Sequence, residues 1–456
     1  MGPRPKLARE PEPRPGVGEP EPSPSLLDPV PEGASMRRLD LSRSAVHLLA
    51  AVLLVAACDS PADPQPVERI EALPRALTSS EVGLIDAGEA FAFDFLRQIV
   101  AEEDAGANVF VSPLSASMAL GMTLEGAEAG TFEAMRTALR LGNLDREEIG
   151  AAYRSLIDLL SDLDPTVSME IGNSVWHREG FSLEAPFVSA VERDFLARVA
   201  GLDFNDPAAA DVINSWVDEA TNGLIDGIVD PPIDPLTMLF LINAIYFEGQ
   251  WTTPFDPART RSGDFRRPDG SASEVPFMWM SDQSFPFAAN PEYEAIELPY
   301  GGEAFVMTVV LPSETIGIDA FVESLDAAAW TGIVTGMGES EVLLGLPKFS
   351  LEYGTSLNEV LKALGMAVAF DEAAADFSRM HRDALEMRLH ISRVKQKAFV
   401  EVDEEGTRAA AVTSVEVGVT SAPPTFVVYR PFVFAIRERL SGALLFTGVV
   451  RDPAAG

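Results

Sequence analysis

The chain has 456 residues, 47% of them hydrophobic, which is ample for a large core, and its formal net charge is −36. Because such a surface repels phosphate and sulfate polyanions, we expect no nucleic-acid partner and expect heparin binding to be disfavoured. A single cysteine, Cys58, excludes an internal disulfide, and the four histidines (His47, His177, His381 and His390) have no metal-ligand spacing. We therefore expect no metal site and no cofactor.

The N-terminal region is predicted to direct export rather than to form part of a folded domain. Residues 1–35 contain ten prolines and no apolar periodicity, so we expect disorder there, and a start at Met36 would leave them untranslated. A basic stretch after Met36 precedes the apolar run 45–57, which is too short to span a bilayer as a helix. Residues 36–57 are therefore predicted to be a signal peptide.

The signal peptide ends in Val55-Ala56-Ala57-Cys58, which resembles a bacterial lipobox. That resemblance implies cleavage before Cys58 and acylation of its thiol; the alternative is an ordinary Ala-x-Ala cleavage beside a buried thiol. Acylation would anchor the chain in a membrane, and the proline-containing residues 58–79 would form the tether. We expect an exported, membrane-anchored lipoprotein facing the periplasm or the extracellular space.

Helical periodicity begins after the tether. Residues 81–103 place five apolar side chains on one helical face: Leu84, Ala87, Phe91, Phe95 and Ile99. Asp206-Pro207 is typical of a helix start, and Asn222-Gly223 of a helix end.

Strand patterns occur throughout and dominate the C-terminal third. "TMLFLINAIYF" at 237–247 is apolar on both faces, which favours a central strand covered on both sides. Four later segments alternate or are rich in β-branched residues: "EVLLGLPKFSLEY", "LHISRVKQKAFVEV", "TFVVYRPFVFAIRE" and "GALLFTGVV". We predict an α+β fold with mostly antiparallel sheets, in one domain over residues 80–456.

The stretch 402–424, "VDEEGTRAAAVTSVEVGVTSAPP", is compatible with two structures, a β-strand and an exposed loop. From residue 407 to residue 416 it alternates as a strand does, with a face of small side chains and a face that carries Arg408 and Glu416. Its surroundings, an acidic glycine bend and Pro423-Pro424, describe an exposed loop. A segment able to be strand or loop indicates a conformational switch.

At these residues the chain resembles the serpins. The resemblance covers residues 81–453 and is carried, in the family's order, by "NVFVSPLSASMALGMTLEGAEAGT", "LINAIYFEGQW", "LGLPKFSLEYGTSLNEVLKALGM", "ISRVKQKAFVEVDEEGT" and "PFVFAIRERLSGALLFTGVV". It implies about nine helices around three mostly antiparallel sheets, with an exposed reactive-centre loop at about 404–424. It also implies a suicide-substrate inhibitor of serine proteases, which is cleaved in the loop, traps the acyl-enzyme and inserts the loop into the main sheet.

The resemblance assigns the hinge at which insertion starts. Its residues are Glu404, Gly406, Thr407, Ala409, Ala410 and Ala411. Thr407 enters the sheet first, and we expect it to be exposed before cleavage. The family usually has an acidic residue where Arg408 stands; by alternation Arg408 faces outward, so its charge should be tolerated.

The reactive bond follows from the family's spacing. Counting forward from Gly406 and back from "RPFVF" both give Thr420–Ser421, with Val419–Thr420 as the alternative. Neither arginine, lysine nor an aromatic residue precedes the cut closely. We therefore expect an elastase-like or subtilisin-like target.

The resemblance also assigns two further groups of residues, the shutter and the breach. Ser112, Ser115 and Asn243 match the shutter, where the sheet strands part, and Gln396 stands where the family usually has a histidine. Gly249 and Trp251 match the breach, where insertion begins; plain core packing is the alternative for both. Glutamine does not titrate near neutral pH, so an acid response that depends on the histidine should be absent.

Two other classes of protein fit these residues less well. A serpin-fold carrier or plain protease substrate is the first alternative, but Thr407, Ala409 and Ala411 are small enough to enter a sheet. A Ser-His-Asp hydrolase lacks a Gly-x-Ser-x-Gly elbow, and His177 in "SVWHR" has no evident nucleophile. We expect the chain to be a monomer and not an enzyme, with a serine protease as its covalent partner.

Overall fold

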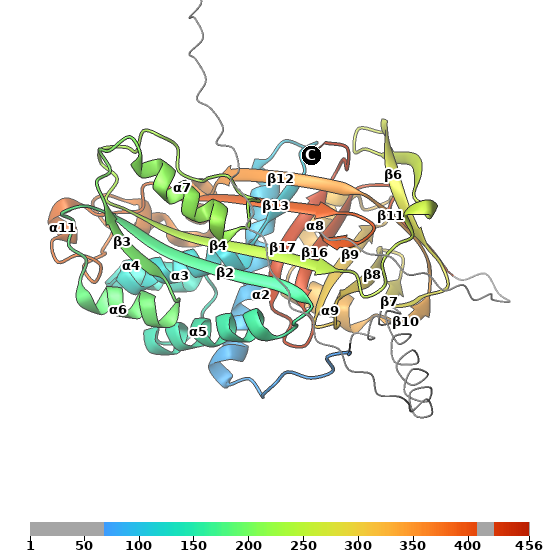
Figure 1. The fold of residues 1–456 in the computed structure, drawn as a ribbon, viewed down its shortest axis with the longest axis horizontal. Helices are drawn as coiled ribbons and strands as arrows, with labels where there is room; N and C mark the ends of the chain where they lie inside the picture. The colour runs from blue at the N-terminus through green and yellow to red at the C-terminus, as the bar shows by residue number, and fades with distance from the viewer. Residues whose placement is uncertain (1–67, 408–423, 456) are drawn as a thin grey trace, which may run out of the picture. The chain divides into compact units, whose positions relative to one another are not determined.

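The computed structural model describes residues 68–407 and 424–455 (Figure 1). Predictions for residues 1–67, including the signal peptide and Cys58, therefore lie outside the described residues. The helices are α2 (Ser79–Glu102), α3 (Pro113–Gly126), α4 (Ala129–Ala138), α5 (Arg146–Asp162), α6 (Ala185–Asp194), α7 (Ala209–Ala220), α8 (Ile318–Ser324), α9 (Ala327–Thr335), α10 (Asn358–Leu361) and α11 (Ala384–Met387). Short 3-10 or π turns are η1 (Pro257–Arg259), η2 (Lys362–Met366) and η3 (Ala367–Phe370).

The longest sheet has seven strands in the order β1-β17-β16-β9-β8-β7-β10. Their bounds are β1 (Val109–Val111), β17 (Leu444–Val450), β16 (Phe432–Glu438), β9 (Phe305–Pro312), β8 (Tyr293–Tyr300), β7 (Ser284–Ala289) and β10 (Gly338–Glu341). All of its described pairs are antiparallel. A second sheet, β15-β11-β6-β5, joins β15 (Thr425–Val427), β11 (Leu343–Pro347), β6 (Ala272–Met280) and β5 (Arg261–Arg266).

The strands that concern function form two hydrogen-bonded pieces. One piece is β14-β4-β2-β3, built from β14 (Gly406–Thr407), β4 (Leu239–Gln250), β2 (Val167–Arg178) and β3 (Arg198–Leu202). The other piece pairs β12 (Phe349–Ser356) with β13 (Lys395–Val402). These strands run side by side in Figure 1, yet β4 and β13 exchange no ladder hydrogen bonds among the described residues. The described residues thus form four hydrogen-bonded groups of strands, which correspond to the three expected sheets because one sheet is parted between β4 and β13.

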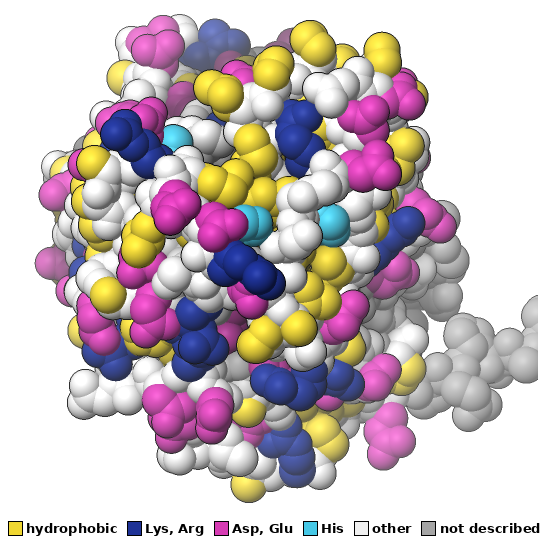
Figure 2. All heavy atoms as spheres, turned by 90° about the vertical axis from the view of Figure 1, so that its left-hand side faces the viewer, with side chains coloured by type: hydrophobic (Ala, Val, Ile, Leu, Met, Phe, Trp, Pro, Cys, Tyr) yellow, Lys and Arg dark blue, Asp and Glu magenta, His cyan; other side chains and the backbone are white. Residues whose placement is uncertain are grey.

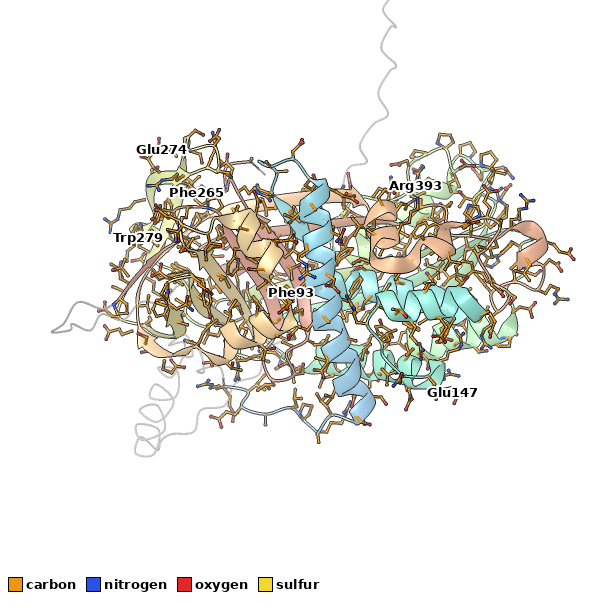
Figure 3. The ribbon with its side chains drawn as sticks, turned by 180° about the vertical axis from the view of Figure 1, so that it is seen from behind. Phe93, Glu147, Phe265, Glu274, Trp279 and Arg393 are labelled. Carbon is orange, nitrogen blue, oxygen red and sulfur yellow. The ribbon has the colours of Figure 1, made fainter. Side chains whose placement is uncertain are left out.

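The sequence patterns explain where helices α2 and α7 begin and which face of α2 is buried. Helix α2 begins in a capping box of Thr78 and Glu81, and all five apolar side chains predicted for its inner face are buried. Seen from behind, α2 crosses the molecule, and its Phe93 ring lies 5.2 Å from that of Trp330 in α9 (Figure 3). Helix α7 starts at Ala209 rather than at Asp206, because the Asp206 side chain caps the preceding turn by accepting from the Ala208 N–H.

Two apolar clusters hold these layers together. The larger one joins α2, α3 and α5 to the long sheet, and a smaller one lies beneath α7, where Ile213 and Val217 meet Trp176 and Ile242. No helix within residues 68–407 and 424–455 is long and apolar enough to cross a membrane.

Candidate functional site at the strand hinge

The predicted hinge begins as a tight turn directly after the C-terminal end of β13. The Asp403 N–H donates to the Gly406 carbonyl at 3.0 Å, and the Asp403 side chain accepts from the Glu405 N–H at 2.9 Å. Gly406 has a φ of +154°, and a Cβ there would lie 2.2 Å from the Gly249 carbonyl oxygen. Only glycine fits this close approach, which lets the chain reverse onto β4.

Thr407 is already seated in the sheet. Gly406 and Thr407 pair antiparallel with Gln250 and Gly249 of β4. The Thr407 side chain is only 5% exposed, and its hydroxyl oxygen lies 2.7 Å from that of Tyr300. The expectation that Thr407 is exposed before cleavage is therefore wrong. The reason is that Gly249 has no side chain, so the Tyr300 ring can fill the space beside the hinge; a Cβ at Gly249 would meet that ring at 3.0 Å.

The predicted breach residue Trp251 completes this junction. Its indole N–H donates to the Asp403 carbonyl and its backbone N–H to the Glu405 carbonyl, both at 2.9 Å. Its ring stacks on Tyr300, with the two centroids 4.5 Å apart. Burial raises the pKa of Tyr300, so its hydroxyl stays neutral and remains a hydrogen-bond donor. The structure thus brings Gly249, Trp251 and Thr407 together around Tyr300.

Glu404 is held by two side chains from other parts of the chain, Lys348 just before β12 and Thr260 just before β5. Its carboxylate accepts from the Lys348 ammonium at 2.5 Å and from the Thr260 hydroxyl at 2.7 Å. Burial works against ionisation, but these hydrogen bonds outweigh it and lower the pKa of Glu404. The acidic turn is therefore pinned to the start of β12, which sequence reasoning did not find because Lys348 lies 56 residues away in the chain.

The four predicted shutter residues also meet. The Gln396 side chain of β13 donates to the Ser112 carbonyl at 2.7 Å and accepts from the Ser112 N–H at 3.3 Å. The Ser115 hydroxyl donates to the Asn243 carbonyl of β4 at 3.4 Å. The N-terminus of α3 thus lies across the gap, with hydrogen bonds to both bordering strands. The Asn243 amide donates to Asn173 at 2.9 Å, while its buried oxygen has no hydrogen-bond partner among the described residues.

A narrow cavity marks the gap itself. It measures about 20 Å³ and is lined by β4 at residues 242–245, β13 at residues 397–399, α3 at Ser112 and Ser115, and the chain after α7. This volume is close to that of one water molecule. A strand therefore enters here only if β4 and β13 move apart. Residues Ala409, Ala410, Ala411, Thr420 and Ser421 lie outside the described residues.

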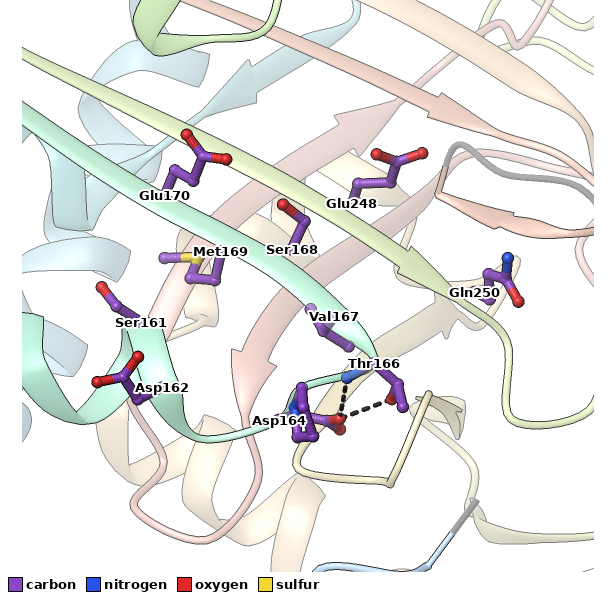
Figure 4. Close-up of a pocket in the computed structure, with 11 residues that line it drawn as sticks. Ser161, Asp162, Asp164, Thr166, Val167, Ser168, Met169, Glu170, Glu248 and Gln250 are labelled. Atoms are coloured by element: carbon purple, nitrogen blue, oxygen red, sulfur yellow. Dashed lines mark hydrogen bonds between the residues drawn. The ribbon is translucent and has the colours of Figure 1, made fainter. Parts of the chain in front are cut away.

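A wider cleft lies beside the N-terminal end of β2 and the C-terminal end of β4 (Figure 4). Its volume is about 620 Å³, and its lining includes the carboxylates of Asp162, Asp164, Glu170 and Glu248. Asp164 accepts hydrogen bonds from the Thr166 N–H and hydroxyl, at 3.0 and 2.6 Å. Within the described part of the chain no group of acidic, histidine or cysteine residues is arranged to hold a metal ion.

His177, the residue considered for a hydrolase, lies in β2. Its Nδ1 is 3.2 Å from the Arg178 carbonyl oxygen, and its ring packs against Gly201 in the neighbouring strand. These contacts place it in the sheet, away from the hinge and the shutter.

A parted, mostly antiparallel sheet, a glycine hinge at one end of the gap and a helix N-terminus that bridges its middle define the serpin fold. The model of the family described as serpin (serine protease inhibitor) matches residues 86–453. The chain belongs to this family.

Curated relatives and solved structures agree. Glia-derived nexin from Rattus norvegicus is 34% identical over 354 residues, which cover 76% of this chain and 88% of the nexin. A serpin-like protein from Thermococcus kodakarensis is 34% identical over 82% of this chain and 87% of its own length. The native thermophilic serpin tengpin has a TM-score of 0.74 at 28% identity, covering 85% of this chain and 97% of tengpin.

The comparisons correct the way in which enzymatic activity was described. The expectation about enzymatic activity was a negative one, that the chain is not an enzyme. The family description, together with an intracellular coagulation inhibitor from Tachypleus tridentatus that is 32% identical, replaces it with a positive statement. The family to which the chain belongs is described as one of serine protease inhibitors.

Proposed function

We propose that the chain is a suicide-substrate inhibitor of serine endopeptidases that traps its target by inserting the loop after Thr407 between β4 and β13. The observation that carries this proposal is the hinge: Gly406 and Thr407 already pair with β4, beside a gap that no strand of the described residues fills. A target would attack the Thr420 carbonyl, break the bond to Ser421 and form an acyl-enzyme. Insertion of the loop would then carry the acylated protease along.

The observed pairing fixes a register for the proposed insertion. Each step along the loop from Thr407 is one step back along β4 from Gly249, and likewise along β13 from the Asp403–Gly406 pair. This register would put Thr413 between Asn243 and Gln396. The unpartnered buried oxygen of Asn243 would then gain a donor from the threonine hydroxyl.

The same register gives a reason for Arg408. It would lie between Glu248 of β4 and Glu401 of β13, on the outward face where Glu401 is exposed. An acidic residue at this position would meet two carboxylates, whereas arginine meets complementary charge. Small residues at 409 and 411 would face the core and enter without overpacking.

The proposed target has an elastase-like or subtilisin-like specificity, because the residues before Thr420 are small and apolar. We further propose a lipid-anchored, exported protein of the bacterial lipoprotein type, with Cys58 as the acylated residue and a single folded unit after the tether. A monomer suffices for this mechanism.

Heparin binding is not part of the proposal, although native protease nexin-1, solved with heparin, is similar to this chain at 31% identity and a TM-score of 0.73. Helix α5 carries Glu147, Glu148, Asp158 and Asp162 against two arginines. On the end of the molecule that carries α11, basic side chains are interspersed with acidic ones rather than gathered (Figure 2). Sulfate groups would be repelled by such a surface.

The test is to mix the full-length protein with pancreatic elastase or subtilisin and to analyse it on denaturing gels. We expect a covalent complex that survives denaturant, with cleavage after Thr420. Thyroxine-binding globulin, solved with its hormone, shares this fold at 28% identity and a TM-score of 0.74, and it stands for the carrier alternative. Cleavage without any complex would favour a plain substrate or carrier.

A further inference from the structure

Residues 221–236, in the connection between α7 and β4, cross over the gap and are called here the crossing segment. It is fixed to α7 by Asn214, whose side-chain oxygen accepts from the N–H groups of Ile228 and Val229, both at 2.9 Å. The Asn214 amide donates to the Val229 carbonyl at 2.8 Å. The crossing segment therefore moves with α7.

Helix α7 is in turn fixed to one border of the gap. Its Trp216 and Ala220 pack on Gly172 of β2, where an added Cβ would lie 3.2 to 3.3 Å from them. Its Ile213 and Val217 are buried in the cluster beneath it. One end of the crossing segment is thus tied to the β2–β4 side of the gap (Figure 1).

The other end is tied to β13, on the opposite border. The Lys397 ammonium lies 2.6 Å from an Asp226 carboxylate oxygen, and the Lys395 ammonium is paired with Asp230. Arg393, at the surface beside them (Figure 3), lies 3.7 Å from Asp230. Since β13 and β4 share no ladder bonds among the described residues, these ion pairs span the gap.

The space beneath these pairs is the path of an entering strand. Leu224, Ile225 and Ile228 line the roof of the narrow cavity, while β4 and β13 line its sides. A strand that passes between β4 and β13 has to lift the crossing segment or widen the distance that the ion pairs span. Either motion breaks the contacts of Asp226 and Asp230 with β13.

We propose that Asp226 and Asp230, paired with Lys397 and Lys395, form an ionic clasp that keeps the crossing segment closed over the gap and slows strand entry. This regulatory role rests on the proposed loop insertion. The two carboxylates are largely exposed, at 88% and 70%. Exposed pairs are individually weak and are screened by salt, so the clasp sets the rate of entry rather than preventing it.

The first experiment measures the uncleaved, full-length protein by amide hydrogen exchange. The double variant Asp226→Asn with Asp230→Asn should open the segment 224–230 about three- to tenfold more often than wild type, because each lost pair contributes about two- to threefold. Asp234→Asn is the matched control: it removes one charge from the same segment, but the Asp234 side chain accepts from the Leu236 N–H. The contact of Asp234 with Arg178 of β2 is made by its backbone carbonyl, which the variant keeps. This variant should exchange as wild type does.

Salt provides a second arm. Raising KCl from about 0.02 to 0.5 M should increase opening in wild type and in Asp234→Asn and leave the double variant unchanged. Subtilisin provides the third arm: the double variant should form denaturant-resistant complex faster than wild type. Equal exchange in wild type and the double variant would overturn the clasp. Faster exchange without faster complex formation would overturn its role in strand entry.

The two proposals fail separately. If wild type forms no complex with any elastase-like or subtilisin-like protease, the inhibitor role is contradicted. The hydrogen-exchange and salt arms use uncleaved protein and decide the clasp without a protease.

Discussion

Thr407 and Tyr300 share a hydrogen bond between two buried hydroxyl groups, 2.7 Å apart, at the point where the hinge joins β4. Tyr300 in turn stacks on Trp251, which binds the two carbonyls of the hinge turn. The uncleaved protein therefore holds the first residue pair of its proposed inserted strand. Substitutions at Thr407 should act on the uncleaved state as well as on insertion.

The first prediction concerns Thr407→Arg. A guanidinium cannot be buried beside the neutral Tyr300 without a partner, so the hinge should leave β4 and Tyr300 should lose its hydrogen bond. We expect a lower thermal midpoint of the uncleaved protein and conversion of the inhibitor into a substrate, cut at the same bond. Differential scanning calorimetry and the yield of denaturant-resistant complex report these two effects.

Thr407→Val is the matched control, because it keeps the shape and removes only the hydroxyl. It should destabilise the uncleaved protein by about 1 kcal/mol and still trap protease. Arg408→Ala, on the outward face, should have a small effect. Trapping by Thr407→Arg at the wild-type yield would show that Thr407 does not lead the insertion.

The second prediction concerns the reactive bond. Thr420→Arg should redirect inhibition toward trypsin and weaken it toward elastase, because a trypsin-like protease requires a basic residue before the cut. Val419→Arg is the comparison, since it would redirect inhibition only if the bond were Val419–Thr420. Mass spectrometry of the released fragment identifies the bond, and a cut distant from residue 420 would refute the assignment.

The third prediction concerns pH. Glu125 is 4% exposed, its carboxylate lies 3.9 Å from the Arg146 guanidinium, and burial raises its pKa to about 7. Because this pKa lies above that of the unfolded chain, the stability that it contributes is complete below about pH 4.5 and is lost as the pH rises through 7. We expect a loss of up to about 3 kcal/mol between pH 5 and pH 8.

Glu125→Gln should flatten this part of the profile, measured as the thermal midpoint from pH 5 to pH 8. Glu147→Gln, on the exposed side of α5, should keep the wild-type slope. Parallel profiles for wild type and Glu125→Gln would exclude a role for this carboxyl. Gln396 does not titrate, so no shutter histidine contributes to the curve.

The fourth prediction concerns anchoring. Cys58→Ser should abolish acylation and release soluble or unprocessed protein from the membranes of a bacterial host. Ser60→Ala, which leaves the thiol in place, should remain membrane-bound. The measurement is incorporation of labelled palmitate together with membrane fractionation. Unchanged fractionation of Cys58→Ser would count against the lipobox interpretation.

The periodicity of the sequence predicted the local secondary structure of this fold. The buried face of α2 follows from its 3.6-residue pattern, and the strands β16 and β17 lie within the segments predicted for them. Strand β4 overlaps its predicted segment 237–247 but continues to Gln250. The segment 389–402 was predicted as one strand, but β13 begins only at Lys395. Arg388, with a left-handed φ of +54°, ends α11 just before it, and residues 389–394 connect the two elements.

The candidate site was predictable only where the resemblance supplied it. Gly406, Trp251 and the shutter residues were named from motifs, and the structure brings them together. Tyr300 and Lys348 were not found, because their contacts with Thr407 and Glu404 join residues 107 and 56 positions apart. No local pattern encodes such contacts. The ion pairs that close the gap were missed for the same reason.

The most direct test of the account is the structure and stability of the protein cleaved once at Thr420. We predict that cleavage raises the thermal midpoint strongly, because the loop becomes a strand between β4 and β13, and that Thr413 lies beside Asn243 and Gln396 in that form. An unchanged thermal midpoint, with the cleaved loop still outside the sheet, would contradict loop insertion and with it the proposed inhibitory mechanism.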